Sequence, residues 1–298
     1  MLSSTYLYPV VQTWDYKQFG TAMKLGISPK KGRQSRVLIS ANEVSSPELC
    51  HLVRVCAPDL LGQTRFEELL RQQDVCLALS YVVKYLGEYA GVALVAQRQP
   101  HLHLCMLAVR KELRSRGLGS LLLEAVLTSA QPHLLSLDVL SRNVRALAMY
   151  QYYGFKLQRS SFFWHRPLPL RWGCIYKGSV RALAPDIALN RTETPSLAWP
   201  AQSRSLLQKL PFLRGAVYMN LGVIRGVALF HSGLERIVVY RLAAADKLAA
   251  RALFRYMHLV TPSASAIFLR WMQGEQLSSY LREMGFRCHS EYHILQSE

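Results

Sequence analysis

Apolar residues along the first half of the chain alternate between the spacing of a strand and that of a helix. Short apolar runs predict strands at 36–41, 75–86, 90–97, 102–109 and 134–140. Helical spacing predicts helices at 48–57, 63–72, 121–130 and 143–153. Pro47, next to Ser46, favours a helix start there. The pattern therefore indicates an α/β (α+β) fold.

The pattern is interrupted between residues 160 and 200 and then begins again. Five prolines stand in this interval, part of which, at 161–168, is a last possible strand. Farther on, Gly226 to Phe230 (GVALF) repeats Gly91 to Val95 (GVALV), and Gly285-Phe286 repeats Gly154-Phe155. Because the intervals are nearly equal, 63 residues from Gly91 to Gly154 and 59 from Gly226 to Gly285, we infer a tandem duplication. Coincidence is the alternative, since Gly-Val-Ala-Leu is a common strand sequence.

Four segments follow from this reading. We expect a basic arm at 1–36, a first domain at 37–165, a linker at 166–195 and a second, similar domain at 196–298. The arm has Asp15 as its only acid beside six basic residues, so it is either a plain basic arm or an organelle transit peptide.

Composition narrows the class of protein. With 298 residues and 50% apolar content, the chain is long and apolar enough to bury one or two cores. Its formal net charge of +17 favours acidic partners such as CoA phosphates, an acidic carrier protein, nucleic acid or an anionic membrane surface. No apolar run is long enough to span a bilayer, and the start lacks a secretory pattern. The spacing of the six cysteines suggests neither a zinc site nor a redox pair, so we expect reduced thiols and a cytoplasmic location.

A glycine-rich junction lies between the strand at 102–109 and the helix at 121–130. It reads RSRGLGS, with Gly117 and Gly119, and exposes backbone N–H groups at the positive end of a helix. Such a junction suits a pyrophosphate. Its spacing differs from the dinucleotide fingerprint and from the Walker loop, so neither NAD nor ATP is the expected ligand.

The junction and a second motif together resemble the GNAT superfamily of N-acyltransferases. Arg114, Gly117 and Gly119 match the family's pyrophosphate signature in order. The second signature is matched without insertion by Asn143, Ala146, Tyr150, Gly154 and Phe155. The resemblance implies a mixed, mostly antiparallel and splayed sheet flanked by helices, followed here by a second GNAT-like domain.

The resemblance also implies roles for individual residues. Backbone N–H groups would bind the CoA pyrophosphate from Arg114, Ser115, Arg116, Gly117, Leu118, Gly119 and Ser120. The strand edge at Leu107, Ala108 and Val109 would pair with the pantetheine amides, and one of its N–H groups could polarise the thioester. Asn143 would begin the helix and contact the cofactor arm, and Tyr150 would protonate the leaving sulfur as general acid.

Two residues compete for the role of general base. Asp138 stands where ribosomal-protein N-terminal acetyltransferases carry a carboxylate, and His103 stands where histone acetyltransferase-type members carry a glutamate. Ordered water is the third possibility. A surface Asp and a hydrogen-bonded core His are the structural alternatives.

The second copy departs from the family at each of these points. Its junction, AAADKLAARAL, has no glycine pair, Leu281 stands in place of Tyr150, and Gly274 in place of Asn143. We therefore expect it to bind no CoA and to serve as a cover, part of the acceptor groove or a built-in pseudo-dimer partner. The basic stretch from Arg142 to Arg191 is either a solvated face or a docking surface for an acyl carrier protein or the acceptor, and Trp164, Trp172 and Trp199 either line a pocket or are core.

The expected function is transfer of an acyl group, acetyl by default, from acyl-CoA to a primary amine of a peptide, protein or small metabolite, without a metal. One alternative is a fatty-acyl GNAT enzyme that takes a longer chain from CoA or an acyl carrier protein to a peptide amine. The other is a catalytically silent module that binds CoA or nucleic acid, although no RNA-binding aromatic motif is present.

Overall fold

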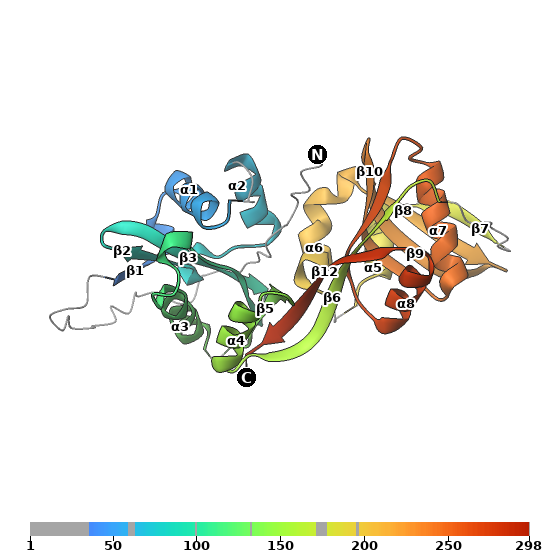
Figure 1. Cartoon of the computed structure of the whole chain (residues 1–298). Helices are drawn as coiled ribbons and strands as arrows, with labels where there is room; N and C mark the ends of the chain where they lie inside the picture. Colours follow the sequence, from blue (N-terminus) through green and yellow to red (C-terminus); the bar gives the residue numbers. More distant parts are fainter. Residues whose placement is uncertain are drawn as a thin grey trace. The chain divides into compact units, whose positions relative to one another are not determined.

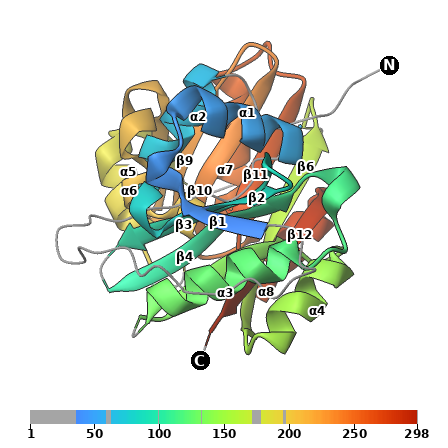
Figure 2. The same cartoon turned by 90° about the vertical axis from the view of Figure 1, so that its left-hand side faces the viewer.

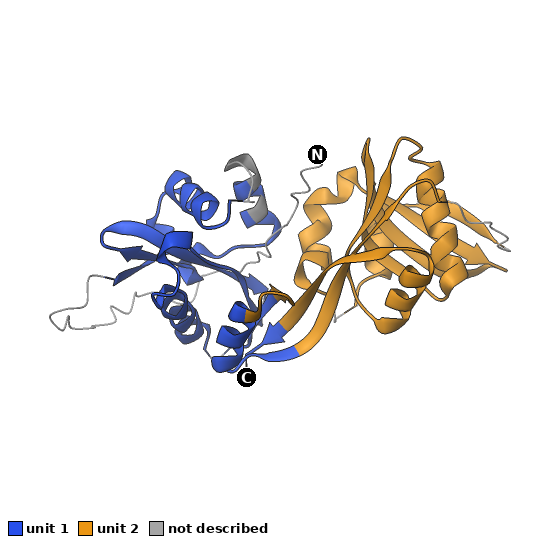
Figure 3. Cartoon of the chain, viewed as in Figure 1, with its two compact units in different colours: residues 1–138, 145–157, 295–298 blue, residues 139–144, 158–294 orange. Residues whose placement is uncertain are grey.

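The structure is a computed structural model that describes residues 36–58, 63–98, 100–131, 133–170, 178–194 and 197–297, without the side chains of 63–65 and 69. The chain divides into two compact units, coloured separately in Figure 3. Unit 1 comprises Met1–Asp138, Arg145–Leu157 and Leu295–Glu298, and unit 2 comprises Val139–Val144 and Gln158–Ile294. Most of the basic arm lies outside the described residues, as do Trp172 and part of the expected linker.

Unit 1 is a mixed sheet with helices on both faces. Its strands are β1 (Arg36–Ser40), β2 (Tyr81–Tyr85), β3 (Glu88–Arg98), β4 (His101–Val109) and β5 (Leu135–Leu140), in this order across the sheet. All neighbours are antiparallel except β4 and β5, which are parallel. Helices α1 (Ser46–Cys56) and α2 (Gln63–Gln72) lie on one face, and α3 (Leu118–Ala130) and α4 (Val144–Tyr152) on the other (Figures 1 and 2).

Unit 2 repeats this order of elements. It contains β7 (Ser179–Leu183), α5 (Pro185–Arg191), α6 (Ser203–Leu206), β8 (Arg214–Asn220), β9 (Val223–Ser232), β10 (Arg236–Ala244), α7 (Lys247–Leu259), β11 (Ala266–Met272), α8 (Glu275–Glu283) and β12 (Arg287–Gln296). The strand β6 (Lys156–Pro167) also belongs to it from residue 158 onward. As in unit 1, the first four strands, β7 to β10, are antiparallel to their neighbours, and the next pair, β10 and β11, is parallel. The predicted repetition is confirmed.

The two copies agree in detail. Gly91 of β3 pairs with the last residue of β4, and Gly226 of β9 pairs with the last residue of β10. Each fourth strand has one bulge, at Cys105 and at Tyr240. Helices α4 and α8 are both 9 residues long and end before a left-handed glycine, Gly154 or Gly285. These shared irregularities align the copies residue by residue.

Two sequence-based expectations differ from the structure. Residues 75–86 were expected to be one strand, but β2 begins only at Tyr81. The hydroxyl of buried Ser80 donates to the Cys76 carbonyl and accepts the Val95 N–H, which turns the chain before β2. In the interval 166–195, expected to be a linker, the structure has β7 and α5. The expected functional boundaries at 37–165 and 196–298 stay predictions.

Alternate residues of the central strands of unit 2 fill two cores. Ala216, Ala228 and Phe230 pack with α7 and α8, whereas Val217, Val227 and Leu229 pack with α5 and α6. Trp164 and Trp199 are buried. In the described part of the chain, no helix is long and apolar enough to cross a membrane.

The sheet of each unit includes a segment that follows the other copy along the chain. In unit 1 the N–H of Ser297 donates to the Leu135 carbonyl at 2.8 Å, and the Leu135 N–H donates to the Ser297 hydroxyl at 3.0 Å. In unit 2, β6 pairs antiparallel with β11. The start of β5 is therefore held by the final residues of the chain.

Candidate functional site

The junction between β4 and α3 has the open geometry of an anion site. Gly117, the residue before α3, has φ 76° and ψ 7°, a left-handed conformation that suits glycine. Ser115 is also left-handed, with φ 65°. The first N–H groups of a helix have no partner within it, and Gly117 has no side chain to cap them. The N-terminus of α3, at Leu118, Gly119 and Ser120, can therefore bind an anion.

Arginines from several elements surround this junction. Arg114 donates to the Val109 carbonyl at 3.1 Å, and Arg116 lies against the ring and hydroxyl of Tyr85. Arg145 of α4 donates to the Ser115 hydroxyl at 3.0 Å. A methyl group at Gly117 would lie 3.4 Å from Nη1 of Arg36. The positive charge of these side chains, added to that of the helix end, fits a diphosphate.

The edge of β4 next to β5 becomes open at the same end of the sheet. β4 and β5 pair only from Leu102 and Leu135 to Leu104 and Leu137, whereas β3 pairs with β4 as far as Val109. From Cys105 onward, β4 therefore has no described strand of unit 1 on its β5 side. Leu107, Ala108 and Val109 are half-buried on this edge, where their backbone can hydrogen-bond an extended ligand.

Tyr150 lies on α4 with its side chain almost fully buried. Its ring packs edge-on against Phe155, with the ring centroids 5.7 Å apart. Burial raises the pKa of the phenol, which therefore keeps its proton at physiological pH. Helix α4 also packs on α3, because a methyl group at Gly119 would lie 3.8 Å from Sδ of Met149.

His103 and Asp138, the two candidate bases, are neighbours in the structure. Nε2 of His103 lies 3.8 Å from Oδ2 of Asp138, and their side chains are 2% and 0% exposed. Nδ1 of His103 lies 2.7 Å from the hydroxyl of Ser136, which donates to the Leu102 carbonyl at 3.0 Å. Burial, and secondarily Arg98, lowers the pKa of His103 well below its usual value.

The remaining candidate residue, Asn143, stands directly before α4. It belongs to unit 2, and its N–H donates to the Leu140 carbonyl at 2.8 Å. The structure also shows two residues that sequence reasoning did not single out, Ser136 and Met149, and it places Arg145, predicted only as part of the basic stretch, at the glycine-rich junction. Ser136 could have been noticed because, two residues before Asp138, it lies on the same face of a strand.

The junction between β10 and α7 in unit 2 carries a carboxylate, that of Asp246, whereas the corresponding junction of unit 1 is open. Only Ala245 and Asp246 separate β10 from α7. The Asp246 carboxylate accepts the Ala249 N–H at 2.8 Å and pairs with Arg225 at 2.7 Å. The N-terminus of α7 is thus capped by its own chain.

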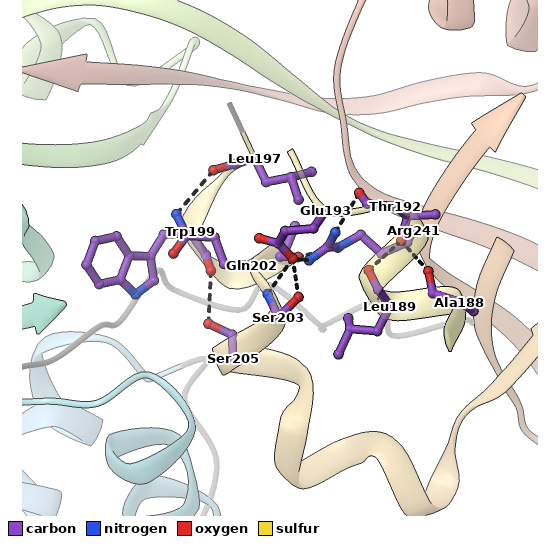
Figure 4. Close-up of polar contacts among 11 residues, drawn as sticks. Ala188, Leu189, Thr192, Glu193, Leu197, Trp199, Gln202, Ser203, Ser205 and Arg241 are labelled. Atoms are coloured by element: carbon purple, nitrogen blue, oxygen red, sulfur yellow. Dashed lines mark hydrogen bonds and ion pairs between the residues drawn. The ribbon is translucent and has the colours of Figure 1, made fainter. Parts of the chain in front are cut away.

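Unit 2 also differs at the position of Met106, where the strand register places Arg241. Arg241 is 2% exposed and donates to the Thr192 carbonyl and the Glu193 carboxylate, both at 2.7 Å, and to the Ala201 carbonyl (Figure 4). Glu193 in turn accepts the N–H of Ser203 at 3.1 Å. Burial lowers the pKa of Arg241, opposed by the bond to Glu193. This network ties β10 to the segment around α5 and α6.

The other catalytic candidates have no counterpart in unit 2. The register aligns His103 with Val238 and Asp138 with Arg270. Leu281 takes the place of Tyr150 on α8, and its carbonyl accepts the Phe286 N–H just as that of Tyr150 accepts the Phe155 N–H. The fold of the motif is kept while its reactive groups are replaced.

Comparison with known proteins identifies the family of the first half. The sequence model of the acetyltransferase (GNAT) family matches residues 46–155. None of the curated proteins matches the chain by sequence. Within the described ranges, no group of three or more His, Cys, Asp or Glu residues could hold a metal ion.

Solved structures share the fold over most of the chain. A GCN5-related N-acetyltransferase from Anabaena variabilis is 13% identical with a TM-score of 0.62, covering 88% of this chain and 72% of its own. One from Sphaerobacter thermophilus is 16% identical with a TM-score of 0.60, covering 88% and 95%. A tandem GNAT protein from the clavulanic acid biosynthesis pathway is 14% identical with a TM-score of 0.58, covering 89% and 98%. Residues 46–155 are therefore a GNAT-family acetyltransferase domain, within a chain that has the fold of a tandem GNAT protein.

Proposed function

We propose that the chain transfers an acyl group, acetyl by default, from acyl-CoA to a primary amine of a peptide, protein or small metabolite. The observation that carries this proposal is the uncapped N-terminus of α3 behind left-handed Gly117, inside the domain that matches the family. The N–H groups from Arg114 to Ser120 bind the pyrophosphate. The edge at Leu107, Ala108 and Val109, where no described strand of unit 1 pairs on the β5 side, binds the pantetheine amides, and an N–H there polarises the thioester carbonyl.

The reaction is a direct attack of the amine on the thioester. The C–N bond forms as the C–S bond breaks, the amine proton passes to a base, and the thiolate takes the proton of Tyr150. The buried, protonated phenol supports the role of general acid. His103 and Asp138 are the candidates for the base, and Asn143 supports the start of α4. Unit 2 takes no CoA, because Asp246 and Arg241 fill the corresponding positions.

The test is mass spectrometry of the full chain incubated with CoA thioesters from acetyl to long-chain, or with an acylated carrier protein, and a panel of amines. We expect acyl-amine products with a preference for one donor length, from a protein active in the cytoplasm. A preference for the carrier protein or for long chains would instead favour the fatty-acyl alternative. Binding of acetyl-CoA by calorimetry without any turnover would reduce the chain to a CoA-binding module, and absence of CoA binding would refute the proposal.

A further inference from the structure

Ser136 sits between His103 and the backbone of β4. The strand register sets Ser136 directly opposite His103. The Ser136 hydroxyl donates its single proton to the Leu102 carbonyl at 3.0 Å. The second contact, 2.7 Å to Nδ1 of His103, must then use a proton of the ring. The arrangement therefore favours the tautomer with hydrogen on Nδ1.

The other ring nitrogen of His103 faces Asp138. With hydrogen on Nδ1, a neutral imidazole turns the lone pair of Nε2 toward the carboxylate oxygen 3.8 Å away. Both side chains are buried, so little solvent screens the repulsion between that lone pair and an ionised carboxylate. A single proton shared by the two groups removes the repulsion, and the pair therefore titrates as one unit.

The charged groups described on the neighbouring elements of unit 1 lie on β3, α1 and α3. Arg98, at the end of β3, acts on His103 and pairs with Asp74 at 2.9 Å. Helices α1 and α3 pack against β4 and carry the exposed residues Glu48, His51, Arg54 and Glu124, together with the buried thiols of Cys50 and Cys56. Asp138 of β5 is the carboxylate whose Oδ2 lies 3.8 Å from Nε2 of the ring.

We propose that Ser136 is a positioning residue. It holds His103 with Nδ1–H directed to its hydroxyl and Nε2 directed to Asp138, so that His103 and Asp138 bind and release one proton as a pair. His103 and Asp138, the two candidates for the general base, then act together as a single base.

For catalysis this inference rests on the proposed function. The deprotonated pair accepts the amine proton as the C–N bond forms, while the sulfur takes the proton of Tyr150. Transfer of a proton from the pair to the phenolate restores both groups, so that amine and thioester give amide and thiol. Uptake of the proton by the pair removes the repulsion between the Nε2 lone pair and the carboxylate.

Removal of the Ser136 hydroxyl changes which ring nitrogen of His103 carries the hydrogen. In Ser136→Ala the ring loses its acceptor at Nδ1, and the tautomer with Nε2–H directed to Asp138 becomes favoured. An N–H directed at the carboxylate favours its ionised form electrostatically, so the pair binds its proton less tightly. We expect the acid limb of the pH–rate profile to move to lower pH. Above this limb kcat should fall on the order of 10-fold, part of the 10²–10⁴ that a positioned base contributes.

Nitrogen NMR of the full chain, labelled at histidine, tests the tautomer directly. The chain has nine histidines, and His103→Gln identifies the signal of His103. We expect the Nδ1–H form in the wild type and in Ser136→Thr, which keeps a hydroxyl, and the Nε2–H form in Ser136→Ala. Asp138→Asn should shift the titration of His103. Ser129→Ala, which loses the contact of Ser129 with the Tyr81 hydroxyl in the same unit, is the matched control and should change nothing.

An Nε2–H tautomer in the wild type at neutral pH, or a titration of His103 indifferent to Asp138→Asn, would overturn the inference. The wild-type spectrum alone decides if Ser136→Ala does not fold. The NMR readout needs no substrate. If the spectrum shows the expected tautomer but no acyl transfer is detected, only the proposed function is refuted. If acyl transfer is detected but the spectrum shows the Nε2–H tautomer, only this inference is refuted.

Discussion

The glycine shared by the two copies offers a matched pair of substitutions, Gly91→Ala and Gly226→Ala. A methyl group at Gly91 would lie 2.9 Å from the Ala108 carbonyl oxygen and 3.1 Å from Cγ2 of Val109. At Gly226 the nearest atom would be Cδ1 of Leu253, at 3.0 Å, with a carbonyl oxygen at 3.2 Å. The first clash is with backbone of the proposed CoA-binding strand, and the second is mainly with a flexible side chain.

The distances set the expected cost. Overpacking a well-filled site costs about 1–3 kcal/mol. We expect Gly91→Ala near the upper end, because a strand carbonyl moves only with its strand, and Gly226→Ala near the lower end. At about 2–4 °C per kcal/mol for a domain of this size, the fall in Tm is roughly 6–12 °C for Gly91→Ala and roughly 2–4 °C for Gly226→Ala.

The two variants should differ more in ligand binding than in stability. Displacement of Ala108 and Val109 alters the edge that we expect to pair with pantetheine, so Gly91→Ala should weaken CoA binding at least 10-fold. Gly226→Ala should leave CoA binding unchanged. Thermal unfolding and calorimetric titration with CoA, both on the full chain, measure the two effects. Equal loss of CoA affinity in both variants would show that affinity follows general stability and would refute the reasoning.

Three further changes have distinct expected outcomes. Tyr150→Phe should lower kcat at least 10-fold while stability and the Kd for acetyl-CoA stay nearly constant, because only the acidic proton is lost; an unchanged kcat in a pre-steady-state assay would remove Tyr150 from the mechanism. Arg241→Met restores the first-copy residue but removes the guanidinium that donates to Glu193 and to the carbonyls of Thr192 and Ala201, so urea unfolding should show a loss of about 2–4 kcal/mol, with one CoA still bound per chain; a second bound CoA would contradict a closed unit 2. Deletion of residues 295–298 should speed amide hydrogen exchange in β5 but not in β10, because the bonds between Leu135 and Ser297 are lost; equal exchange in both strands would show that these bonds do not hold β5.

Local features of the chain were predictable because they depend on near neighbours. Gly117 and Gly154 are at left-handed positions, where the absence of a side chain matters. The helix α2 was predicted with its observed bounds from the spacing of its apolar residues. The repeated Gly-Val-Ala-Leu segment located a second copy because the same strand meets the same helix in both units. In contrast, β2 was predicted too long because a single hydroxyl, that of Ser80, makes tertiary bonds that the apolar pattern does not reveal.

The chemistry around β5 depended on contacts between strands that lie far apart in sequence. The sequence offered Asp138 and His103 as alternative general bases. The register of β4 and β5 places Oδ2 of Asp138 3.8 Å from Nε2 of His103 and brings the Ser136 hydroxyl to Nδ1 of the same ring. Arg241, an ordinary basic residue in the sequence, is buried because acceptors at residues 192, 193 and 201 surround it. A buried charge or imidazole is tolerated only where partners from other elements satisfy it, and the chain order does not say which elements will meet.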